Sequence, residues 1–573
     1  MKNLNIAILS GGSGNDALIK GLKKIYPDAN IRVVVNAYDN GKSTGICRAV
    51  TGTLGVSDIR KNHSRMYEVS TKHVDMRLKE FYDGRYTFTP GKEIQEIKGK
   101  LSLWGLSEFD AYVDAFFENE NSYSYFYKDF SVANIIYSQM YKELGYEETN
   151  RRFCELLGIE DFVVLNSFDN VFINAVTESG AILQDEGDIV EHCNPNDKIV
   201  RIFYTGDRQV RINPVAKEVV LNADLLIIST GTFWSSIYPT LEYGDFYQVV
   251  NKSPAKKIWA MNCTEDKDAY GVTNLDFMTI VSNLGLDLDE FTVLLNSDAD
   301  PALKCTGKLG EPKVDNIVLA AMENNNGKHN GDKYAKAIFR IYYGISSSDK
   351  YDKILFDFDD TIWARDKAEE DISIDNLKLL NEHLSKKICV ISGNTYESIV
   401  KKLFRVFGTE LKNFNIDIWA DANSVKYVKG KPTDFMHEFA ITGYRNIISY
   451  LKDEFGIDAT INSTEFPVCL KIKPLGDRER KILASHLNHI FESINIKNCV
   501  AVCTGSSTID IISGNNNKDV VLESKFGDPS KILYIGDEVT SGNDKDIAKK
   551  CSHAIHTTGV KETNMLIRLL IDE

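Results

Sequence analysis

The chain has 573 residues, more than a single hydrophobic core accommodates, so it is expected to divide into several domain-sized units. Its composition, 43% hydrophobic and 26% charged, is typical of a soluble globular protein. A formal net charge of -15 disfavours partners such as nucleic acid or an anionic membrane surface. Small anionic ligands stay compatible with that charge, because local loops and metal ions govern their binding.

The ten cysteines occur singly, with no CxxC pair. The first residues lead straight into a glycine turn and do not resemble a secretory leader. No apolar run approaches the ~20 residues of a membrane span. These features predict reduced thiols in a cytoplasmic protein.

The N-terminal residues predict a β-turn-α-β unit. Leu4–Leu9 and Ile31–Val35 are short apolar strands, and Asn15–Ile25 between them has apolar residues at helical spacing. The small residues of Ser10–Gly14 would let backbone N–H groups approach a phosphate at the start of the helix.

This glycine turn also fits a dinucleotide fingerprint, Gly12-x-Gly14-x-x-Ala17, with Asp39 near the position of a ribose-binding acid. The pattern therefore leaves a nicotinamide or flavin cofactor open as an alternative. A Walker A loop at GKST is rejected, because the glycine that it needs is Asn36 here.

Five further segments strengthen a different interpretation: Asn36–Arg48, Gly55–Asn62, Phe130–Tyr141, Ser229–Leu241 and Trp259–Phe277. In order and spacing they resemble the CofD/YvcK family. That family includes the phospholactate transferase of deazaflavin-coenzyme biosynthesis and a group of nucleotide-sugar-binding regulators. The resemblance covers about the first 325 residues.

The resemblance implies a cleft for a nucleotide diphosphate, lined by a Gly-rich loop, an Asp-Asp-Gly loop and a Gly-Asp-Ile-Arg-Asn loop. Such loops offer backbone and hydroxyl donors to phosphate oxygens, an acid can hold Mg²⁺, and an Arg can pair bidentately with a phosphate. Carried over by position, the cleft residues are Gly11, Gly12, Gly14, Asp39, Asn40, Ser43, Asp58, Arg60, Asn62, Asn134, Gly231, Thr232, Ser236 and Asn262.

Two positions depart from the family pattern. Asn40 replaces the second acid of the Asp-Asp-Gly loop, and Lys42 replaces a following glycine. Asn40 removes a negative charge and Lys42 adds a positive one. These departures put transfer of phospholactate itself in doubt and leave open a nucleotide-sugar sensor without chemistry.

Beyond a polar Asn/Gly-rich stretch at Met322–Asp332, a second module is expected to begin near Ser346–Asp352. The apolar run in Lys353–Trp363 ends in Asp357 and Asp359. Two carboxylates at one strand tip repel each other, which predicts a divalent cation between them.

Three later signals are collinear with this one: the strand ICVISG ending in Ser392, Lys518, and the strand that delivers Asp537 and then Asp544. The set resembles the haloacid dehalogenase (HAD) superfamily. The resemblance implies a nucleophile at Asp357, an acid/base at Asp359, and phosphoryl contacts from Ser392 and Lys518. It implies Mg²⁺ held by Asp357, Asp359 (through its backbone carbonyl), Asp537 and Asp544, with Asn543 orienting this shell.

About 120 residues separate Ser392 from Lys518, which predicts an inserted α/β cap at about 430–500. Asp417–Val428 resembles the core strand of the capped sugar-phosphatase and phosphomannomutase branch. The cap is expected to contain a helix over Ile441–Phe455 and strands at Ala459–Ile461 and Val468–Ile472. Its candidate sugar contacts are Asn462, Thr464, Glu465, Lys471 and Lys473.

The predicted fold class is α/β, with two Rossmann-like parallel-sheet modules at 1–345 and 351–573, the second carrying the cap. We expect a bifunctional phosphoester enzyme: a Mg²⁺-dependent phosphatase for a small, sugar-like phosphorylated metabolite, fused to a domain for a nucleotide diphosphate or nucleotide sugar. The N-terminal domain would transfer or hydrolyse that ligand, or only bind it. Homo-oligomerisation is left open.

Overall fold

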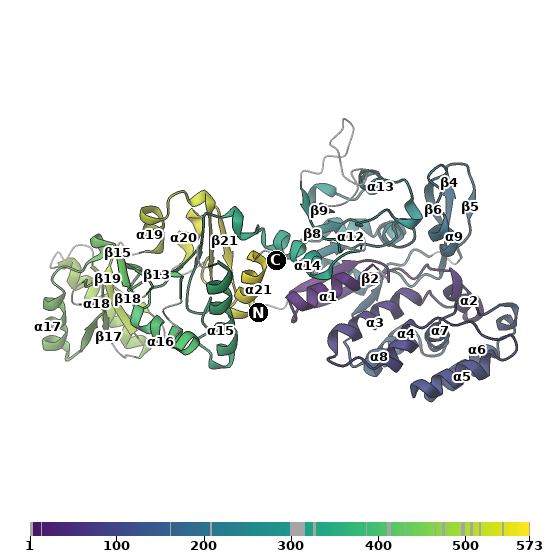
Figure 1. The fold of residues 1–573 in the computed structure, drawn as a ribbon, viewed down its shortest axis with the longest axis horizontal. Coiled ribbons are helices and arrows are strands. Elements are labelled where there is room, and N and C mark those ends of the chain that lie inside the picture. Colours follow the sequence, from purple (N-terminus) through teal and green to yellow (C-terminus); the bar gives the residue numbers. More distant parts are fainter. Residues whose placement is uncertain are drawn as a thin grey trace. The chain divides into compact units, whose positions relative to one another are not determined.

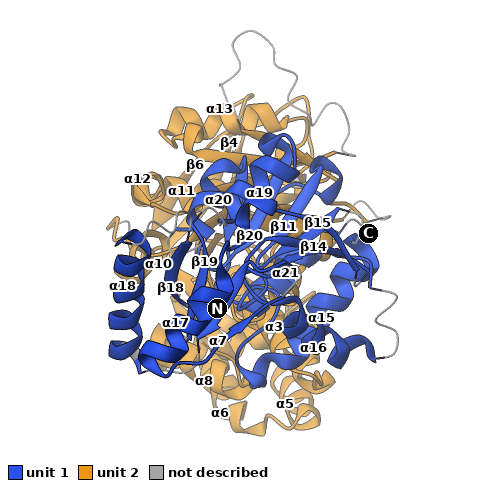
Figure 2. Cartoon of the chain, turned by 90° about the vertical axis from the view of Figure 1, so that its left-hand side faces the viewer, with its two compact units in different colours: residues 1–2, 343–573 blue, residues 3–342 orange. Residues whose placement is uncertain are grey.

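The chain forms two compact units, Asn3–Tyr342 and Tyr343–Glu573, which Figure 2 shows in different colours. Each unit contains its own seven-stranded sheet. The structure is a computed structural model that describes residues 4–12, 14–160, 162–206, 209–297, 316–324, 328–384, 387–408, 414–429, 431–463, 466–472, 476–493, 499–504, 508–514, 517–540 and 544–571.

The sheet of the N-terminal unit is parallel throughout and has the order β10-β9-β8-β7-β1-β2-β3. Its strands are nearly continuous apolar runs, as expected when both faces of a parallel sheet are covered. The chain builds outward in both directions from β1, so the loops after β1 and β7 meet where the strand order reverses. The strands are β1 (Asn5–Leu9), β2 (Asn30–Val35), β3 (Val163–Leu165), β7 (Leu225–Ile228), β8 (Lys256–Ala260), β9 (Phe291–Asn296) and β10 (Ile317–Ala320).

A helical layer covers one side of this sheet (Figure 1). Its centre is α7, in which every residue from Val132 to Tyr141 is buried, and which packs against α2, α3, α4, α6 and α8. The helices up to this point are α1 (Asp16–Ile25), α2 (Lys42–Thr51), α3 (Ser57–Ser70), α4 (Met76–Asp83), α5 (Glu93–Trp104), α6 (Asp110–Phe117), α7 (Val132–Leu144) and α8 (Tyr146–Leu157).

A small antiparallel sheet of order β5-β4-β6 follows β3. The remaining elements of the unit are β4 (Val171–Thr177), β5 (Ile182–Leu183), α9 (Glu186–Glu191), β6 (Ile199–Gly206), α10 (Pro214–Leu221), α11 (Tyr238–Glu242), α12 (Tyr247–Lys252), α13 (Asn274–Leu284) and α14 (Gly331–Tyr343). A π-helical turn at Phe233–Ile237 links β7 to α11.

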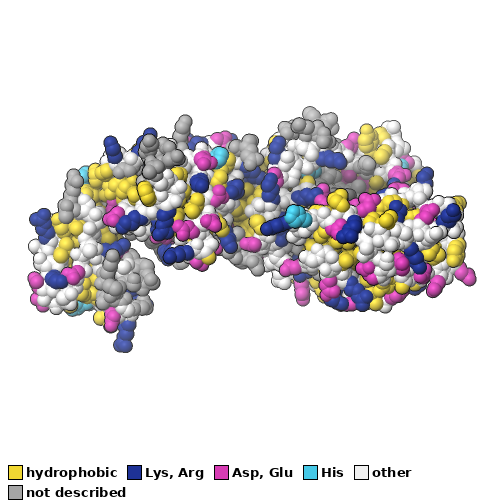
Figure 3. Space-filling view, turned by 60° about the horizontal axis from the view of Figure 1, so that its bottom comes forward, with side chains coloured by type: hydrophobic (Ala, Val, Ile, Leu, Met, Phe, Trp, Pro, Cys, Tyr) yellow, Lys and Arg dark blue, Asp and Glu magenta, His cyan; other side chains and the backbone are white. Residues whose placement is uncertain are grey.

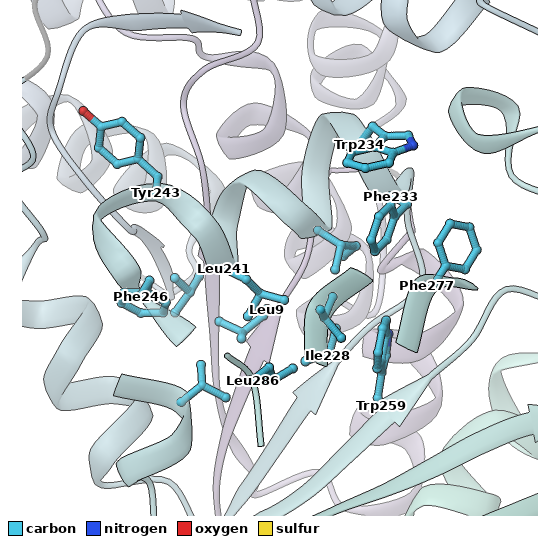
Figure 4. Packing of buried hydrophobic residues seen from close by; sticks show 14 of the residues in the cluster. Leu9, Ile228, Phe233, Trp234, Leu241, Tyr243, Phe246, Trp259, Phe277 and Leu286 are labelled. Carbon is cyan, nitrogen blue, oxygen red and sulfur yellow. The ribbon is translucent and has the colours of Figure 1, made fainter. Parts of the chain in front are cut away.

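Aromatic packing holds that π-helical turn against the sheet. Phe233 and Phe277 of α13 lie 4.4 Å apart between ring centroids, and Trp234 packs edge-on against Phe233. Figure 4 shows these rings beside Trp259 of β8 and Ile228 of β7. The loop after β7 is therefore anchored by buried apolar surface, which gives its polar groups a defined position.

The sheet of the C-terminal unit has the order β15-β14-β13-β12-β11-β20-β21. The five strands from β13 to β21 are parallel, and β14 and β15 add an antiparallel edge. The strands are β11 (Lys353–Phe356), β12 (Ile388–Ile391), β13 (Asp417–Ala420), β14 (Val425–Val428), β15 (Lys431–Phe435), β20 (Ile532–Gly536) and β21 (His553–His556). The helices are α15 (Glu370–Leu379), α16 (Tyr396–Phe407), α19 (Lys518–Lys525), α20 (Lys545–Lys550) and α21 (Val560–Leu570).

A second, antiparallel sheet of order β16-β17-β19-β18 forms the inserted cap. With its two helices it buries a hydrophobic cluster of its own, which includes Leu451, Leu487 and Ile511. The elements of the cap are α17 (Tyr444–Phe455), β16 (Ala459–Ile461), β17 (Cys469–Ile472), α18 (Asp477–Ser493), β18 (Cys499–Thr504) and β19 (Thr508–Ser513). The predicted α/β class with two parallel sheets and an inserted α/β cap is thereby confirmed.

Two details differ from the sequence-based expectation. Asp417–Val428 is a hairpin of β13 and β14, because the backbones of Asp421, Ala422 and Asn423 all turn through positive φ. Asp and Asn tolerate that conformation, so the turn interrupts the apolar run. The last cap strand ends at Ser513, beyond the expected limit near residue 500, whereas residues 431–435 belong to the main sheet.

No helix among the described residues is long and apolar enough to cross a membrane. On the face drawn in Figure 3, positively and negatively charged side chains are intermingled over both units.

His63 in α3 is fully buried, where its Nδ1 lies 2.7 Å from the hydroxyl of Tyr137 in α7. Burial lowers the pKa of its imidazole from 6.5 to about 3. Below pH 6.5 the unfolded chain therefore binds a proton that the folded unit does not, and the free energy of unfolding falls. His63→Phe should remove this contribution, worth about 1.4 kcal/mol between pH 7.5 and 5.5.

The measurement is the change in Tm of the N-terminal unit between the two pH values, followed by hydrogen exchange of α3 and α7. The matched control is His73→Phe, since His73 is exposed just beyond the same helix. An equal loss of stability in wild type and His63→Phe would contradict the assignment.

Candidate functional site

In the C-terminal unit, two carboxylates are placed together by strand register. Strands β11 and β20 are parallel neighbours with Phe356 opposite Ile535, so Asp357 and Asp537 both follow at the carboxyl edge of the sheet. Asp544, just before α20, completes a group whose ligand oxygens all lie within 4.8 Å of one another. It is the only group of this kind among the residues that the structure describes.

Lys518 lies inside this group. Its Nζ lies 2.5 Å from Oδ1 of Asp357 and 2.5 Å from Oδ1 of Asp544, and it donates to the hydroxyl of Tyr534 at 3.2 Å. Lys518 is 2% exposed. One ammonium against three carboxylates leaves two negative charges in a buried place, and such a set of carboxylate oxygens fits a hard divalent cation such as Mg²⁺.

The pKa values reflect this crowding. Burial raises the pKa of Asp357 to about 7, with Asp544 and Asp537 adding to the rise and Lys518 opposing it. Burial, followed by the charge of Asp544, raises the pKa of Asp537 to about 6. For Lys518, burial opposes the charge, but the two adjacent carboxylates outweigh it and raise the pKa. The group therefore carries more negative charge than Lys518 neutralises.

The side chain of Asp359 does not belong to this three-carboxylate group. Its Oδ1 accepts from Nζ of Lys402 at 2.7 Å, and its Oδ2 accepts from Nδ2 of Asn394 at 2.6 Å. The predicted metal contact from Asp359 is thus restricted to its backbone carbonyl. Ser392 lies at the end of β12, and its Oγ accepts from the backbone N–H of Asn394 at 3.1 Å.

Two of the predicted sugar contacts of the cap, Asn462 and Lys471, bond to other residues of the cap. The side chain of Asn462 accepts from the backbone N–H groups of Val468 and Cys469, both at 2.9 Å, which holds a loop in place. Lys471 pairs with Asp510 at 3.9 Å on the neighbouring strand. Thr464, Glu465, Lys473 and also Asn543 lie outside the described residues.

In the N-terminal unit, the glycine loop after β1 packs closely on its neighbours. A Cβ on Gly12 would lie 2.6 Å from Oδ1 of Asp58, and one on Gly14 would overlap the carbonyl oxygen of Thr230. The side chain of Asn62 donates to the carbonyl of Gly11 at 3.3 Å. The loops after β1 and β7 and the start of α3 thus meet at the point where the strand order reverses.

The loop after β7 contributes a second set of predicted residues. Asn262 accepts from the backbone N–H of Gly231 at 3.3 Å and donates to its carbonyl at 3.0 Å. The hydroxyls of Thr232 and Ser236 lie 3.0 Å apart. Asp268, which was not predicted, accepts from the backbone N–H of Ser235 at 2.8 Å and so helps to position this turn.

Asp39 and Asn40 lie towards the small sheet. Asn40 accepts from the backbone N–H of Glu186 at 2.9 Å and donates to the carbonyl of Ile173 at 3.3 Å. Burial, followed by the negative charge of Asp58, raises the pKa of Asp39. Burial and then Asp39 likewise raise the pKa of Glu186 well above its ordinary value. The carboxylates of Asp39, Asp58 and Glu186 therefore influence one another.

Ser43 and Asn134 form a third set, because Nδ2 of Asn134 donates to Oγ of Ser43 at 2.9 Å. Arg85 donates to the same Oγ at 3.0 Å. The predicted phosphate ligand Arg60 is buried and lines a neighbouring cavity.

Sequence reasoning missed several residues of both sites. Lys402 lies 43 positions from the carboxylate it binds, and Glu186 is brought to the cleft by a separate small sheet. No local motif marks either residue. Lys61 lies within the motif GVSDIRKN itself, and its Nζ lies 3.5 Å from Oδ1 of Asp58, as the i,i+3 spacing within a helix allows.

The close packing of Gly14 makes a stability prediction. In Gly14→Ala the new methyl group would collide with backbone at Thr230, which cannot rotate away. We expect the N-terminal unit to lose about 1–3 kcal/mol of unfolding free energy, measured by urea denaturation. The matched control is Gly99→Ala in α5, where a Cβ meets nothing within 4 Å. That variant should gain about 0.5–1 kcal/mol. Equal stability of the two variants would contradict the close approach.

The protein is similar to several known proteins. The gluconeogenesis factor of Listeria monocytogenes is 25% identical over 258 residues, which is 45% of this chain and 66%, just under two thirds, of that protein. A crystal structure of a Bacillus halodurans protein is 18% identical, with a TM-score of 0.43, and the match covers 59% of this chain and all of that one. A trehalose-6-phosphate phosphatase of Aspergillus fumigatus is 14% identical, with a TM-score of 0.27, over 39% of this chain and 94% of that one.

The sequence model of the family described as 2-phospho-L-lactate transferase CofD matches residues 6–333, which is more than half of the chain. The matched range contains the parallel sheet, the glycine loop and all the cleft residues described above. The chain therefore belongs to the CofD family.

Proposed function

We propose that the C-terminal unit is a phosphomonoester hydrolase of the haloacid dehalogenase type. The observation that carries the proposal is the buried group in which Lys518 bridges Asp357 and Asp544 beside Asp537. The carboxylate of Asp357, buried at a strand tip, can act as a nucleophile. The ammonium of Lys518 would balance the charge of a bound phosphate, and the neighbouring carboxylates would balance that of a cation.

In the first step, an oxygen of Asp357 attacks phosphorus, a P–O bond forms, and the bond to the leaving alkoxide breaks. Asp359 donates the proton that the alkoxide takes. In the second step Asp359 accepts a proton from water, which attacks phosphorus and releases phosphate from Asp357. Lys402 and Asn394, which bind its carboxylate, hold Asp359 for both transfers.

Mg²⁺ bound by Asp357, Asp537 and Asp544 would screen the repulsion between the anionic nucleophile and the anionic substrate. Lys518, released from part of its ion pairing by that cation, would hold a phosphoryl oxygen. Ser392 offers a hydroxyl at the end of the adjacent strand. The cap favours a small, sugar-like leaving group, as in the relatives that the sequence resembles.

For the N-terminal unit we propose binding of a nucleotide-diphosphate-linked ligand over the glycine loop, with transfer or hydrolysis as its reaction. Membership of the CofD family supports a transferase-type activity. The position of the loop at the reversal of strand order, where α/β sheets usually bind ligands, supports the same place for the diphosphate.

A second candidate, a sensor without chemistry, is favoured by Asn40. Both polar groups of its side chain are engaged in hydrogen bonds to Glu186 and Ile173. The residue therefore fulfils a structural role at the position where the family pattern has an acid. Under this candidate the unit would bind a nucleotide sugar and regulate the phosphatase or a partner.

Asp357→Asn keeps the shape of the side chain and removes the nucleophilic carboxylate. We expect phosphate release from a panel of sugar phosphates to fall by on the order of a thousandfold or more. The measurement is inorganic phosphate released by the full chain in the presence of Mg²⁺. The matched control is Asp352→Asn, an exposed acid just before the same strand.

Adding EDTA to the wild type should also abolish release, and Mg²⁺ should restore it. Undiminished release by Asp357→Asn would refute the assignment of the nucleophile. Undiminished release in EDTA would refute the metal.

The proposed diphosphate site predicts a loss of binding in Gly12→Ala, because the methyl group would occupy the space between the glycine loop and α3. We expect nucleotide-sugar affinity to fall at least about tenfold, as for the loss of charged hydrogen bonds. Affinity is measured by calorimetry on the full chain carrying Asp357→Asn, which prevents turnover by the C-terminal unit. The control variant is Gly99→Ala in the same background.

Release of a nucleotide mono- or diphosphate during this titration would favour transfer or hydrolysis. Binding without release would favour the sensor. No binding of any nucleotide sugar, with or without Mg²⁺, would refute the proposal for the N-terminal unit.

A further inference from the structure

A cavity of about 360 Å³ in the N-terminal unit is lined entirely by charged side chains. It lies among α1, α3, α4 and Arg85, which follows α4. Its lining consists of six cations, Lys20, Arg60, Lys61, Arg65, Lys79 and Arg85, and three acids, Asp16, Glu68 and Asp83. The lining therefore carries a surplus of three positive charges.

The three acids are already paired with three of the cations. Lys20 lies 2.9 Å from Asp16 and 2.7 Å from Glu68. Arg65 lies 3.3 Å from Asp16 and 3.5 Å from Asp83. Lys79 pairs with Glu68 and lies 3.4 Å from Asp83.

The surplus comes from the other three cations. Arg85 donates to the neutral oxygens of Ser43 and Asp129, the latter a backbone carbonyl. Lys61 lies 3.5 Å from Asp58, outside the cavity lining. Arg60 has no ion pair among the described residues.

Arg60 is the decisive residue. It is only 2% exposed, yet its Nε and Nη1 meet no hydrogen-bond acceptor among the described residues. Burial, and then the positive charge of Arg85, lowers the pKa of its guanidinium to about 10. A buried, unpaired cation is costly, and salt bridges within the lining do not relieve it. Unmet N–H donors on a cationic guanidinium suit the oxygens of an oxyanion.

We propose that this cavity, defined by Lys20, Arg60, Lys61, Arg65, Lys79 and Arg85, binds the phosphate group of a small metabolite. With Lys61 paired to Asp58, Arg60 and Arg85 remain without a carboxylate partner among the described residues, and two such positive charges favour a dianion over a monocarboxylate. A volume of about 360 Å³ lies at the lower end of the range for small-molecule sites, roughly 300–1,000 Å³.

This site adjoins the glycine loop but differs from it. The stem of Lys61 packs beside Gly12, and Arg85 hydrogen-bonds Ser43. A phosphorylated metabolite here would lie next to a ligand in the cleft, in the place of an acceptor or of a regulator. The proposal does not depend on what the cleft binds.

The test is calorimetric titration of the full chain with inorganic phosphate at pH 7.5, low ionic strength and in EDTA. We expect one phosphate to bind and Arg85→Ala to weaken it at least about tenfold. Arg60→Lys, which keeps the charge but loses the planar guanidinium donors, should weaken it as well. The matched control is Arg77→Ala, an exposed cation of α4 outside the lining, which should leave affinity unchanged.

Glycerol 3-phosphate should compete with inorganic phosphate, and acetate should not. Unchanged affinity in both Arg85→Ala and Arg60→Lys would overturn the proposal. So would loss of phosphate binding in Lys518→Met, which would place the bound phosphate in the C-terminal unit. Nucleotide-sugar binding, measured on the same variants, reports separately on the glycine-loop cleft, so failure of one site is distinguishable from failure of the other.

Discussion

Parallel pairing of strands is the constraint on which both units depend. A parallel sheet has all its carboxyl ends at one edge, so residues that follow different strands converge there without any local sequence relation. In the C-terminal unit this brings Asp537 beside Asp357, although 180 positions separate them. In the N-terminal unit it brings the turn at Gly231 beside the loop at Gly11. The chemistry of each unit is therefore a consequence of strand order and register.

The two units use charge in opposite ways. The C-terminal site gathers carboxylates around the single ammonium of Lys518, which leaves it short of positive charge. The cavity beside the N-terminal cleft gathers cations around the buried guanidinium of Arg60, which leaves it short of negative charge. Each imbalance costs folding free energy. A Mg²⁺ ion would balance the first, and a phosphate would balance the second.

The fold could be predicted to a large extent from the sequence, because apolar strands such as those ending at Leu9 and Phe356 are followed within two residues by a glycine or an acid. The residues predicted at strand ends do lie there. What could not be predicted are partners supplied from elsewhere. Lys402 reaches Asp359 from the face of α16, and Glu186 reaches the cleft from beyond the small sheet. Such contacts depend on how helices pack, which short motifs do not encode.

The hairpin at Asp421–Asn423 was missed for a related reason. Its turn requires three successive residues with positive φ, including Ala422, which has no intrinsic preference for that conformation. The surrounding structure, in which Asp421 accepts from the hydroxyl of Tyr427 at 2.5 Å, holds the turn against its local cost.

The cap encloses a hydrophobic cluster of its own, apart from the one beneath the main sheet. Side chains of the cap's own cluster can therefore be replaced, lengthened or shortened during evolution without disturbing the cluster beneath the main sheet. Catalytic competence and choice of substrate become separately inheritable traits. A lineage could acquire a new metabolite through the cap while its phosphate chemistry stayed unchanged.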